Sequence, residues 1–167
     1  LKIKAISSLE KCFYNTDIDA LSEKKDFIIF KNERLSFQVA FLNTTIDSRI
    51  HQCPVIASGD LAKYVTIRQV ASVPVAYPAP FVKSEGEYLK KEPGIYPDLI
   101  RPLMYDGCVP VPYNNVGAVW VELDTLGERE AGNYSLTIEF KSQENELLAS
   151  TSVNIRIIDE TLPEQEL

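Results

Sequence analysis

Hydrophobic and polar residues alternate along several short stretches of this chain, and the alternation is clearest over residues 134–141. There Tyr134, Leu136, Ile138 and Phe140 fall on one face of an extended chain, while polar or charged residues fall on the other. Successive side chains of a β-strand point to opposite sides, so this pattern predicts a strand with one buried face.

Similar runs predict further strands, and turn-forming residues separate them. The segment Lys31–Glu33 has the spacing of a hairpin turn between the runs at 26–30 and 35–43. Pro54 places its own run at a sheet edge or at a bulge. The predicted strands cover residues 3–6, 26–30, 35–43, 50–58, 63–75, 116–124, 133–142 and 150–158.

No long segment has the 3.6-residue period of an amphipathic helix, which argues against an α/β fold. Seven to nine short strands separated by turns are typical of two packed sheets. The pattern therefore predicts an all-β fold, a two-sheet antiparallel β-sandwich of the immunoglobulin-like type. The apolar positions of the strands predict its core, which consists of Phe37, Val39, Phe41, Val65, Ile67, Val119, Val121, Leu136, Ile138, Phe140, Val153 and Ile155.

The stretch Glu130-Ala131-Gly132-Asn133-Tyr134 resembles the tyrosine corner of immunoglobulin-like sandwiches. In that motif the tyrosine hydroxyl bonds back to the backbone of the turn that enters a late strand. An ordinary glycine turn followed by a core tyrosine is the alternative.

Residues 74–115 depart from the alternating pattern. They hold eight of the ten prolines and are rich in tyrosine. A flexible linker would be rich in Gly and Ser, and a disordered tract would lack the aromatic residues. Proline lowers the entropy lost on ordering and aromatic rings supply area to bury, so we predict a long, ordered, proline- and tyrosine-rich loop.

Charge and composition narrow the possible functions. A net charge of −7 argues against nucleic-acid binding, which needs a clustered basic surface. No apolar stretch approaches the roughly 20 residues of a membrane span. The cysteines Cys12, Cys53 and Cys108 are far apart, so we expect free thiols, and their odd number favours a reducing, cytoplasmic compartment. The chain begins with Leu1 rather than Met, which is typical of a piece cut from a longer protein.

Few residues suggest chemistry. His51 has no flanking motif of a catalytic triad. Asp17 and Asp19 offer two oxygen ligands for calcium, but no EF-hand spacing follows them. The pair Asp159-Glu160 lies at a strand end, where no pocket sets the two pKa values apart. We therefore predict no catalytic residue, no metal site and no cofactor.

Trp120 lies on the opposite face of its strand from Val119 and Val121. If these valines belong to the core, the indole points away from it. Three interpretations stay open: the proline-rich loop covers the indole, a neighbouring domain docks on it, or a sugar ring stacks on it.

Four stretches, in order, give the chain a family resemblance: "SSLEKCF", "LSFQVAF", "YVTIRQVASVPV" and "YLKKEPGIYPDLIRPL". The chain resembles the N-terminal β-sandwich domain of bacterial proteins related to glycoside hydrolase family 123. The resemblance implies a sandwich over residues 1–160 and, at 161–167, the start of a link to a C-terminal (β/α)8 barrel. In that family the barrel hydrolyses β-N-acetylgalactosaminides with the help of the substrate's acetamido group and an adjacent Asp-Glu pair.

The resemblance implies that this chain is a non-catalytic accessory domain whose partner is the barrel. We expect the proline-rich loop to brace the sandwich against that partner, with covering one end of the sandwich as the alternative. An independent carbohydrate-binding module is the second hypothesis for function. The residues expected at the domain interface are Pro93, Gly94, Ile95, Tyr96, Pro97, Asp98, Leu99 and Arg101.

Overall fold

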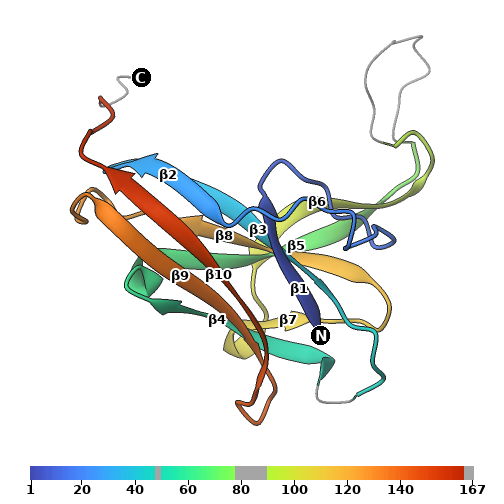
Figure 1. Ribbon diagram of the computed structural model, residues 1–167. Coiled ribbons are helices and arrows are strands. Elements are labelled where there is room, and N and C mark those ends of the chain that lie inside the picture. The colour runs from blue at the N-terminus through green and yellow to red at the C-terminus, as the bar shows by residue number, and fades with distance from the viewer. Residues whose placement is uncertain (48–49, 78–89, 164–167) are drawn as a thin grey trace.

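The computed structural model describes residues 1–47, 50–77 and 90–163. Ten strands form two five-stranded sheets (Figure 1). The first sheet has the order β1-β3-β8-β5-β6 and the second β2-β10-β9-β4-β7. The strands are β1 Lys2–Ser7, β2 Asp26–Phe30, β3 Leu35–Leu42, β4 Gln52–Gly59, β5 Val65–Val75, β6 Gly94–Pro102, β7 Cys108–Pro110, β8 Val116–Leu123, β9 Gly132–Lys141 and β10 Leu147–Ile158.

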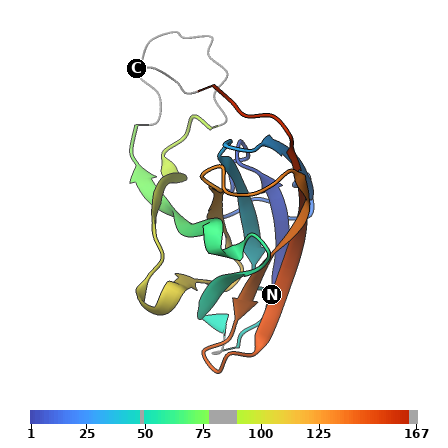
Figure 2. The same ribbon diagram turned by 90° about the vertical axis from the view of Figure 1, so that its left-hand side faces the viewer.

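The predicted β-sandwich is therefore confirmed. In Figure 2, β5 (green) and β10 (red) lie on opposite sides of the molecule, as members of the two sheets. Strand pairs in the described residues are antiparallel, except that β2 runs parallel to β10. Short 3₁₀ turns lie at Ala62–Tyr64 and Tyr105–Gly107. No helix in the described ranges has the length and apolarity to cross a membrane.

The hairpin expected between residues 26–30 and 35–43 is wrong. β2 and β3 belong to different sheets, and residues 31–34 cross from one sheet to the other. The two strands face each other across the core, where the rings of Phe27 and Phe37 lie 5.2 Å apart. A short turn suits such a crossing as well as a hairpin, so loop length alone did not distinguish them.

The core lies between the two sheets and matches the predicted set. Ten of the twelve predicted residues are buried, and the other two, Val65 and Ile67, are partly buried against the same cluster. These two residues lie on β5, next to the edge strand β6. The rings of Phe41 and Phe140 meet across the layers with their centroids 5.6 Å apart.

The predicted tyrosine corner is also present. The Tyr134 hydroxyl donates a hydrogen bond of 2.8 Å to the carbonyl oxygen of Glu130, four residues upstream. The Arg129 guanidinium lies over the Tyr134 ring, 4.9 Å from its centroid. Both contacts fix the entry into β9.

Residues 74–115 are not one long loop as expected. They contain the end of β5, the whole of β6 and β7, and a 3₁₀ turn. β6 is an edge strand, where an N–H that faces away from the sheet has no ladder partner to lose. Its register with β5 shifts beside Pro97, between the Ala71–Leu99 pair and the Ser72–Pro97 pair. Proline is confined to such positions in sheets. The centre of the expected loop, residues 78–89, lies outside the described residues, as do residues 164–167 of the expected link.

A second apolar layer covers the outer face of the first sheet. The segment Ser8–Lys25, here called the strap, contributes Cys12 and Ile18 to it. Small residues on β3 and β8, Ala40 and Ala118, lie beneath these two side chains in the same buried cluster. The first sheet is thus covered on both faces over its central strands.

Truncation of the core should be costly. Phe140→Ala removes a fully buried ring, and we expect the free energy of unfolding to fall by about 3–5 kcal/mol. Ile28→Ala is the control, because Ile28 is 67% exposed and should change stability by less than about 0.5 kcal/mol. Urea unfolding of both variants measures the difference. Equal losses in both would contradict the assignment of the core.

Candidate functional site

β6 carries most of the residues expected at an interface, and its two faces have different surroundings. Arg101 pairs with Gln69 and Leu99 with Ala71, on the face that continues the inner side of the sheet. Ile100 pairs with Val70 and faces the strap side.

On the strap side, Tyr96 packs against the strap. Its ring meets the Phe13 ring edge-on at a centroid distance of 5.6 Å, and the Lys90 ammonium lies 5.0 Å from the Phe13 centroid. The Tyr96 hydroxyl donates a bond of 2.6 Å to the carbonyl oxygen of Glu92. Tyr96 is therefore engaged within the sandwich.

Lys11 of the strap continues this contact. Its ammonium lies 3.4 Å from Asp98 Oδ1 and 3.4 Å from the Pro97 carbonyl oxygen. Pro97 itself is buried. The structure thus turns Tyr96, Pro97 and Asp98 toward the molecule's own strap.

The buried side-chain amide of Gln38, on β3, binds the start of the strap. The Gln38 side-chain nitrogen lies within hydrogen-bond distance of three strap-side carbonyl oxygens: 3.3 Å to Ser7, 3.2 Å to Ser8 and 2.8 Å to Glu10. Burial raises the pKa of the nearby Cys12 thiol to about 11, with Glu10 as a smaller cause. Cys12 is therefore a packing residue and a poor nucleophile at neutral pH.

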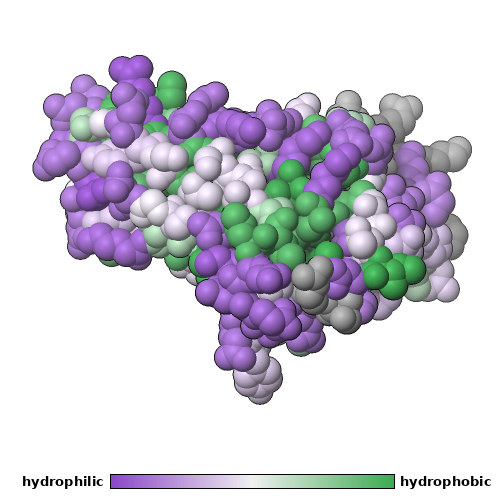
Figure 3. All heavy atoms as spheres, turned by 60° about the horizontal axis from the view of Figure 1, so that its bottom comes forward, coloured by the Kyte–Doolittle hydropathy of each residue, from purple (hydrophilic) through white to green (hydrophobic). Residues whose placement is uncertain are grey.

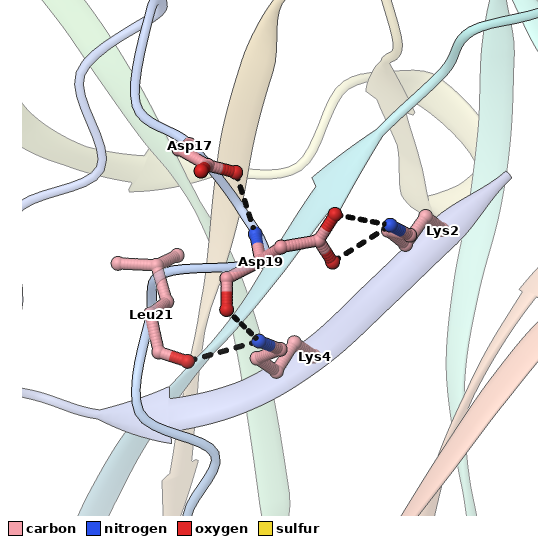
Figure 4. A network of polar contacts seen from close by, with 5 residues as sticks. All are labelled: Lys2, Lys4, Asp17, Asp19 and Leu21. Carbon is pink, nitrogen blue, oxygen red and sulfur yellow. Dashed lines mark hydrogen bonds and ion pairs between the residues drawn. The ribbon is translucent and has the colours of Figure 1, made fainter.

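The far part of the strap is pinned to β1 by charges (Figure 4). The Lys2 ammonium bonds both carboxylate oxygens of Asp19 at 2.7 Å, and the Lys4 ammonium bonds the carbonyl oxygens of Asp19 and Leu21 at 3.1 and 2.9 Å. Asp17 accepts a bond of 2.9 Å from the Asp19 backbone N–H. The two aspartates that suggested calcium ligands thus shape the strap: the Asp19 carboxylate bonds the Lys2 ammonium, and Asp17 bonds the backbone.

Trp120 lies at the junction of the strap and β6. It is partly buried and lines a small cavity of about 70 Å³ together with Gln38, Val70, Pro97 and Ile100. The indole is therefore close to β6, as one of its three interpretations anticipated.

The other side of β6 borders an open groove, here called the β6 groove. It lies between β5–β6 and the segment that follows β7, and Arg101 is its cationic residue on β6. Its main lining residues are Tyr14, His51, Ile95, Leu99, Arg101 and Pro112. Ile95 and Leu99 are about half exposed, at 48% and 47%. Of the eight predicted interface residues, Ile95, Leu99 and Arg101 therefore line one concave surface.

An apolar area occupies the middle of the face that comes forward in Figure 3, and hydrophilic residues surround it. This face is the lower end of the molecule in Figure 1, where β4 and β7 run.

The described residues assemble no catalytic constellation. His51 is exposed and lines the β6 groove. Asp159, just after β10, pairs with Lys31, just after β2, and this pairing lowers the pKa of the Asp159 carboxyl. No three His, Cys, Asp or Glu side chains in the described part of the chain are grouped to hold a metal ion.

Comparison with known proteins adds a likeness of fold. No family model and no curated protein matches the sequence. Among solved structures, a family 123 glycoside hydrolase from Clostridium perfringens superposes on 97% of this chain with a TM-score of 0.69 and 13% identity. A weaker likeness is to the N-terminal domain of PorA, with 10% identity, a TM-score of 0.38, and coverage of 93% of this chain and 97% of that one. Another is to AvmM, which catalyses macrocyclization in alchivemycin A biosynthesis, with 8% identity, a TM-score of 0.47, and coverage of 99% of this chain and 92% of that one. The chain spans 28% of the Clostridium hydrolase, so the likeness covers a part of a much larger protein.

The two faces of β6 predict different effects of truncation. Tyr96→Ala removes an aromatic contact with the strap and should lower the free energy of unfolding by about 1–2 kcal/mol. Leu99→Ala, on the groove side, should cost less than about 0.5 kcal/mol because its side chain is half exposed. Chemical denaturation of the single variants tests this, and a larger loss for Leu99→Ala would reverse the assignment of faces.

The pin at Asp19 predicts an acid dependence. Hydrogen bonding to Lys2 lowers the pKa of Asp19 in the folded state. The stability from this pin is thus fully present above the unfolded pKa of about 4 and is lost as pH falls through the lower folded value. Asp19→Asn should lower the urea midpoint at pH 6, and its difference from the wild type should shrink as the pH falls below about 4. Asp17→Asn is the matched control, because it removes a neighbouring carboxylate but keeps an acceptor oxygen for the turn and leaves the Lys2–Asp19 pair in place. A pH-independent effect of Asp19→Asn would contradict the pin.

Proposed function

We propose that this chain is a non-catalytic β-sandwich module of a glycoside hydrolase-type protein, in which it packs against a (β/α)8 catalytic domain. The observation that carries the proposal is the superposition of nearly the whole chain on a minor part of a family 123 glycoside hydrolase. A module that matches 28% of a hydrolase leaves most of that protein for other domains.

The β6 groove is the proposed contact surface. Ile95 and Leu99 offer apolar area on a strand whose neighbouring residues Pro93, Pro97 and Pro102 have fixed φ angles. A surface that already holds its shape loses little entropy when a partner binds. Tyr96 and Asp98 stabilise this strand from behind through the strap.

The path of the chain beyond β10 supports a defined arrangement of domains. The Asn32 side chain forms a reciprocal pair with the backbone of Leu162: its amide donates at 2.7 Å to the carbonyl oxygen, and its own oxygen accepts at 2.7 Å from the N–H. The Lys31 N–H donates to the Glu160 carbonyl oxygen at 2.9 Å. The segment after β10 is therefore tied to the crossing between the sheets, at the upper left of Figure 1.

Carbohydrate binding by the isolated sandwich receives less support. Sugar rings stack on aromatic faces, and Trp120 lines a cavity that is too small to admit a sugar ring. Tyr14 is an exposed aromatic residue of the β6 groove, but the Lys90 ammonium already lies over its ring, 5.8 Å from the centroid.

Activity assays separate the module from its proposed parent. We expect the purified chain to release no aryl alcohol from an aryl N-acetyl-β-hexosaminide, whereas the longer protein that contains it should do so. Turnover by the chain alone, retained after a second purification from a different expression host, would refute the non-catalytic assignment. A longer protein without a (β/α)8 domain would refute the proposal as a whole.

A double substitution tests the contact surface. Ile95→Ala with Leu99→Ala should shift the melting temperature of the isolated chain by no more than about 2 °C, yet lower that of the same module in the longer protein by clearly more. Ile28→Ala with Ile56→Ala is the matched control, since both isoleucines are exposed on the second sheet. Calorimetry of the wild type and of both double variants, each as the isolated chain and in the longer protein, measures the shifts. An equal effect of the two double variants in the longer protein would exclude the β6 groove as the contact.

A further inference from the structure

Arg101 is held in a fixed orientation at the β6 groove. Its Nε and Nη2 atoms donate to the same oxygen, Gln69 Oε1, at 3.1 and 2.9 Å. Gln69 is buried, with 9% of its surface exposed, and it lies directly opposite Arg101 in the register of β5 and β6. A neutral amide thus orients the guanidinium without neutralising its charge.

Three of the five N–H groups of the guanidinium remain for other partners. A planar group with parallel N–H bonds matches a carboxylate, and such charge-assisted pairs are about twice as strong as neutral hydrogen bonds. Because Gln69 already fixes the plane, a carboxylate that binds here pays little for ordering the arginine side chain.

Arg101 has no internal counter-ion among the described residues, a feature that it shares with Arg129 and Arg156 but not with Arg34 and Arg68. Of these three described arginines without an ion pair, Arg101 is the one that lines the β6 groove. Arg34 pairs with Asp124 at 2.8 Å and Arg68 with Glu122 at 3.4 Å. For Arg101, no carboxylate of the described residues lies within ion-pair distance, although the chain has a net charge of −7. In an acidic protein, an oriented arginine without an acidic neighbour is available to an acid from outside.

The apolar surroundings favour the same occupant. Ile95, Leu99 and Pro112 line the groove beside Arg101. A partner that covers these residues also excludes water from the guanidinium, which strengthens an ion pair formed there. Burial of the Arg101 guanidinium would be costly if the partner brought no negative charge.

We propose that Arg101 binds an Asp or Glu side chain of the domain that packs on the β6 groove. This inference rests on the proposed function and adds the chemistry of the partner surface: an acidic residue set in an apolar patch. Ile95 and Leu99 supply the apolar contact, Arg101 supplies the oriented positive charge, and Gln69 is a positioning residue.

The test compares the melting temperature of the sandwich in the longer protein with that of the isolated chain. Docking on the other domain should make the melting temperature of the sandwich in the longer protein higher than that of the isolated chain, and this difference is called the rise. Arg101→Gln should remove at least half of this rise, and Arg101→Lys should remove less, because lysine keeps the charge without the planar fork. Gln69→Leu should also weaken the rise, through loss of orientation. Arg156→Gln is the control, because Arg156 is an exposed arginine on the second sheet.

Salt gives an independent readout. In the wild type, the rise should shrink between 0.05 and 0.5 M NaCl, because salt screens an ion pair and the Debye length is about 10 Å at 0.1 M. In Arg101→Gln, the rise should depend much less on salt. The isolated variants correct for any loss of the Arg101–Gln69 bonds within the sandwich.

The outcomes separate the two proposals. A rise that survives Arg101→Gln unchanged overturns the ion pair and leaves the docking intact. No rise in the wild type overturns the docking, and the ion pair with it. If the isolated chain binds an oligogalacturonate in calorimetric titration and Arg101→Gln abolishes this, the arginine serves an acidic glycan, and the inference is wrong.

Discussion

Burial of both faces of β3 and β8 is the constraint on which the remaining structure depends. Their inner faces carry Phe37 and Val121 into the core, while their outer faces carry Ala40 and Ala118 under the strap. Small residues on the outer side let the strap lie close to the sheet. The carbonyl groups at its start then find a donor in Gln38, a buried residue of β3. Since the strap also supports Tyr96 and Asp98, the position of β6 follows from the same covering layer.

Period-two alternation predicted the strands and the core because both depend on one buried face per strand. It did not predict the sheet to which each strand belongs. The segment 31–34 is short enough for a hairpin, yet β2 lies parallel to β10 and opposite β3. The hydrophobic faces of Phe27 and Phe37 satisfy either arrangement locally, and only packing across the core decides between them. Likewise, Cys12 and Ile18 of the strap follow no period, so their burial gave no signal in the sequence.

The site was predicted in part. Proline and tyrosine content pointed to β6, but it suggested a loop because prolines usually interrupt strands. The edge position and the shifted register beside Pro97 resolve that conflict. The shift also explains why the adjacent residues Pro97 and Asp98 both border the strap side, whereas ordinary alternation places Leu99 and Arg101 in the groove. Gln69 was not singled out, since its importance comes from lying opposite Arg101 in a strand pairing between residues 32 positions apart.

The prolines of β6 have one more consequence, which concerns self-association. An edge strand offers unpaired N–H and C=O groups, and a foreign strand can extend the sheet along them. At Pro97 and Pro102 the N–H is missing, and the shifted register between them interrupts the regular spacing of the ladder. On the opposite edge of this sheet, the Ala5 carbonyl oxygen already accepts a bond of 2.9 Å from the Lys24 N–H of the strap. The sheet is therefore poorly suited to growth by strand addition at either end, and a neighbour must recognise its side chains instead of its backbone.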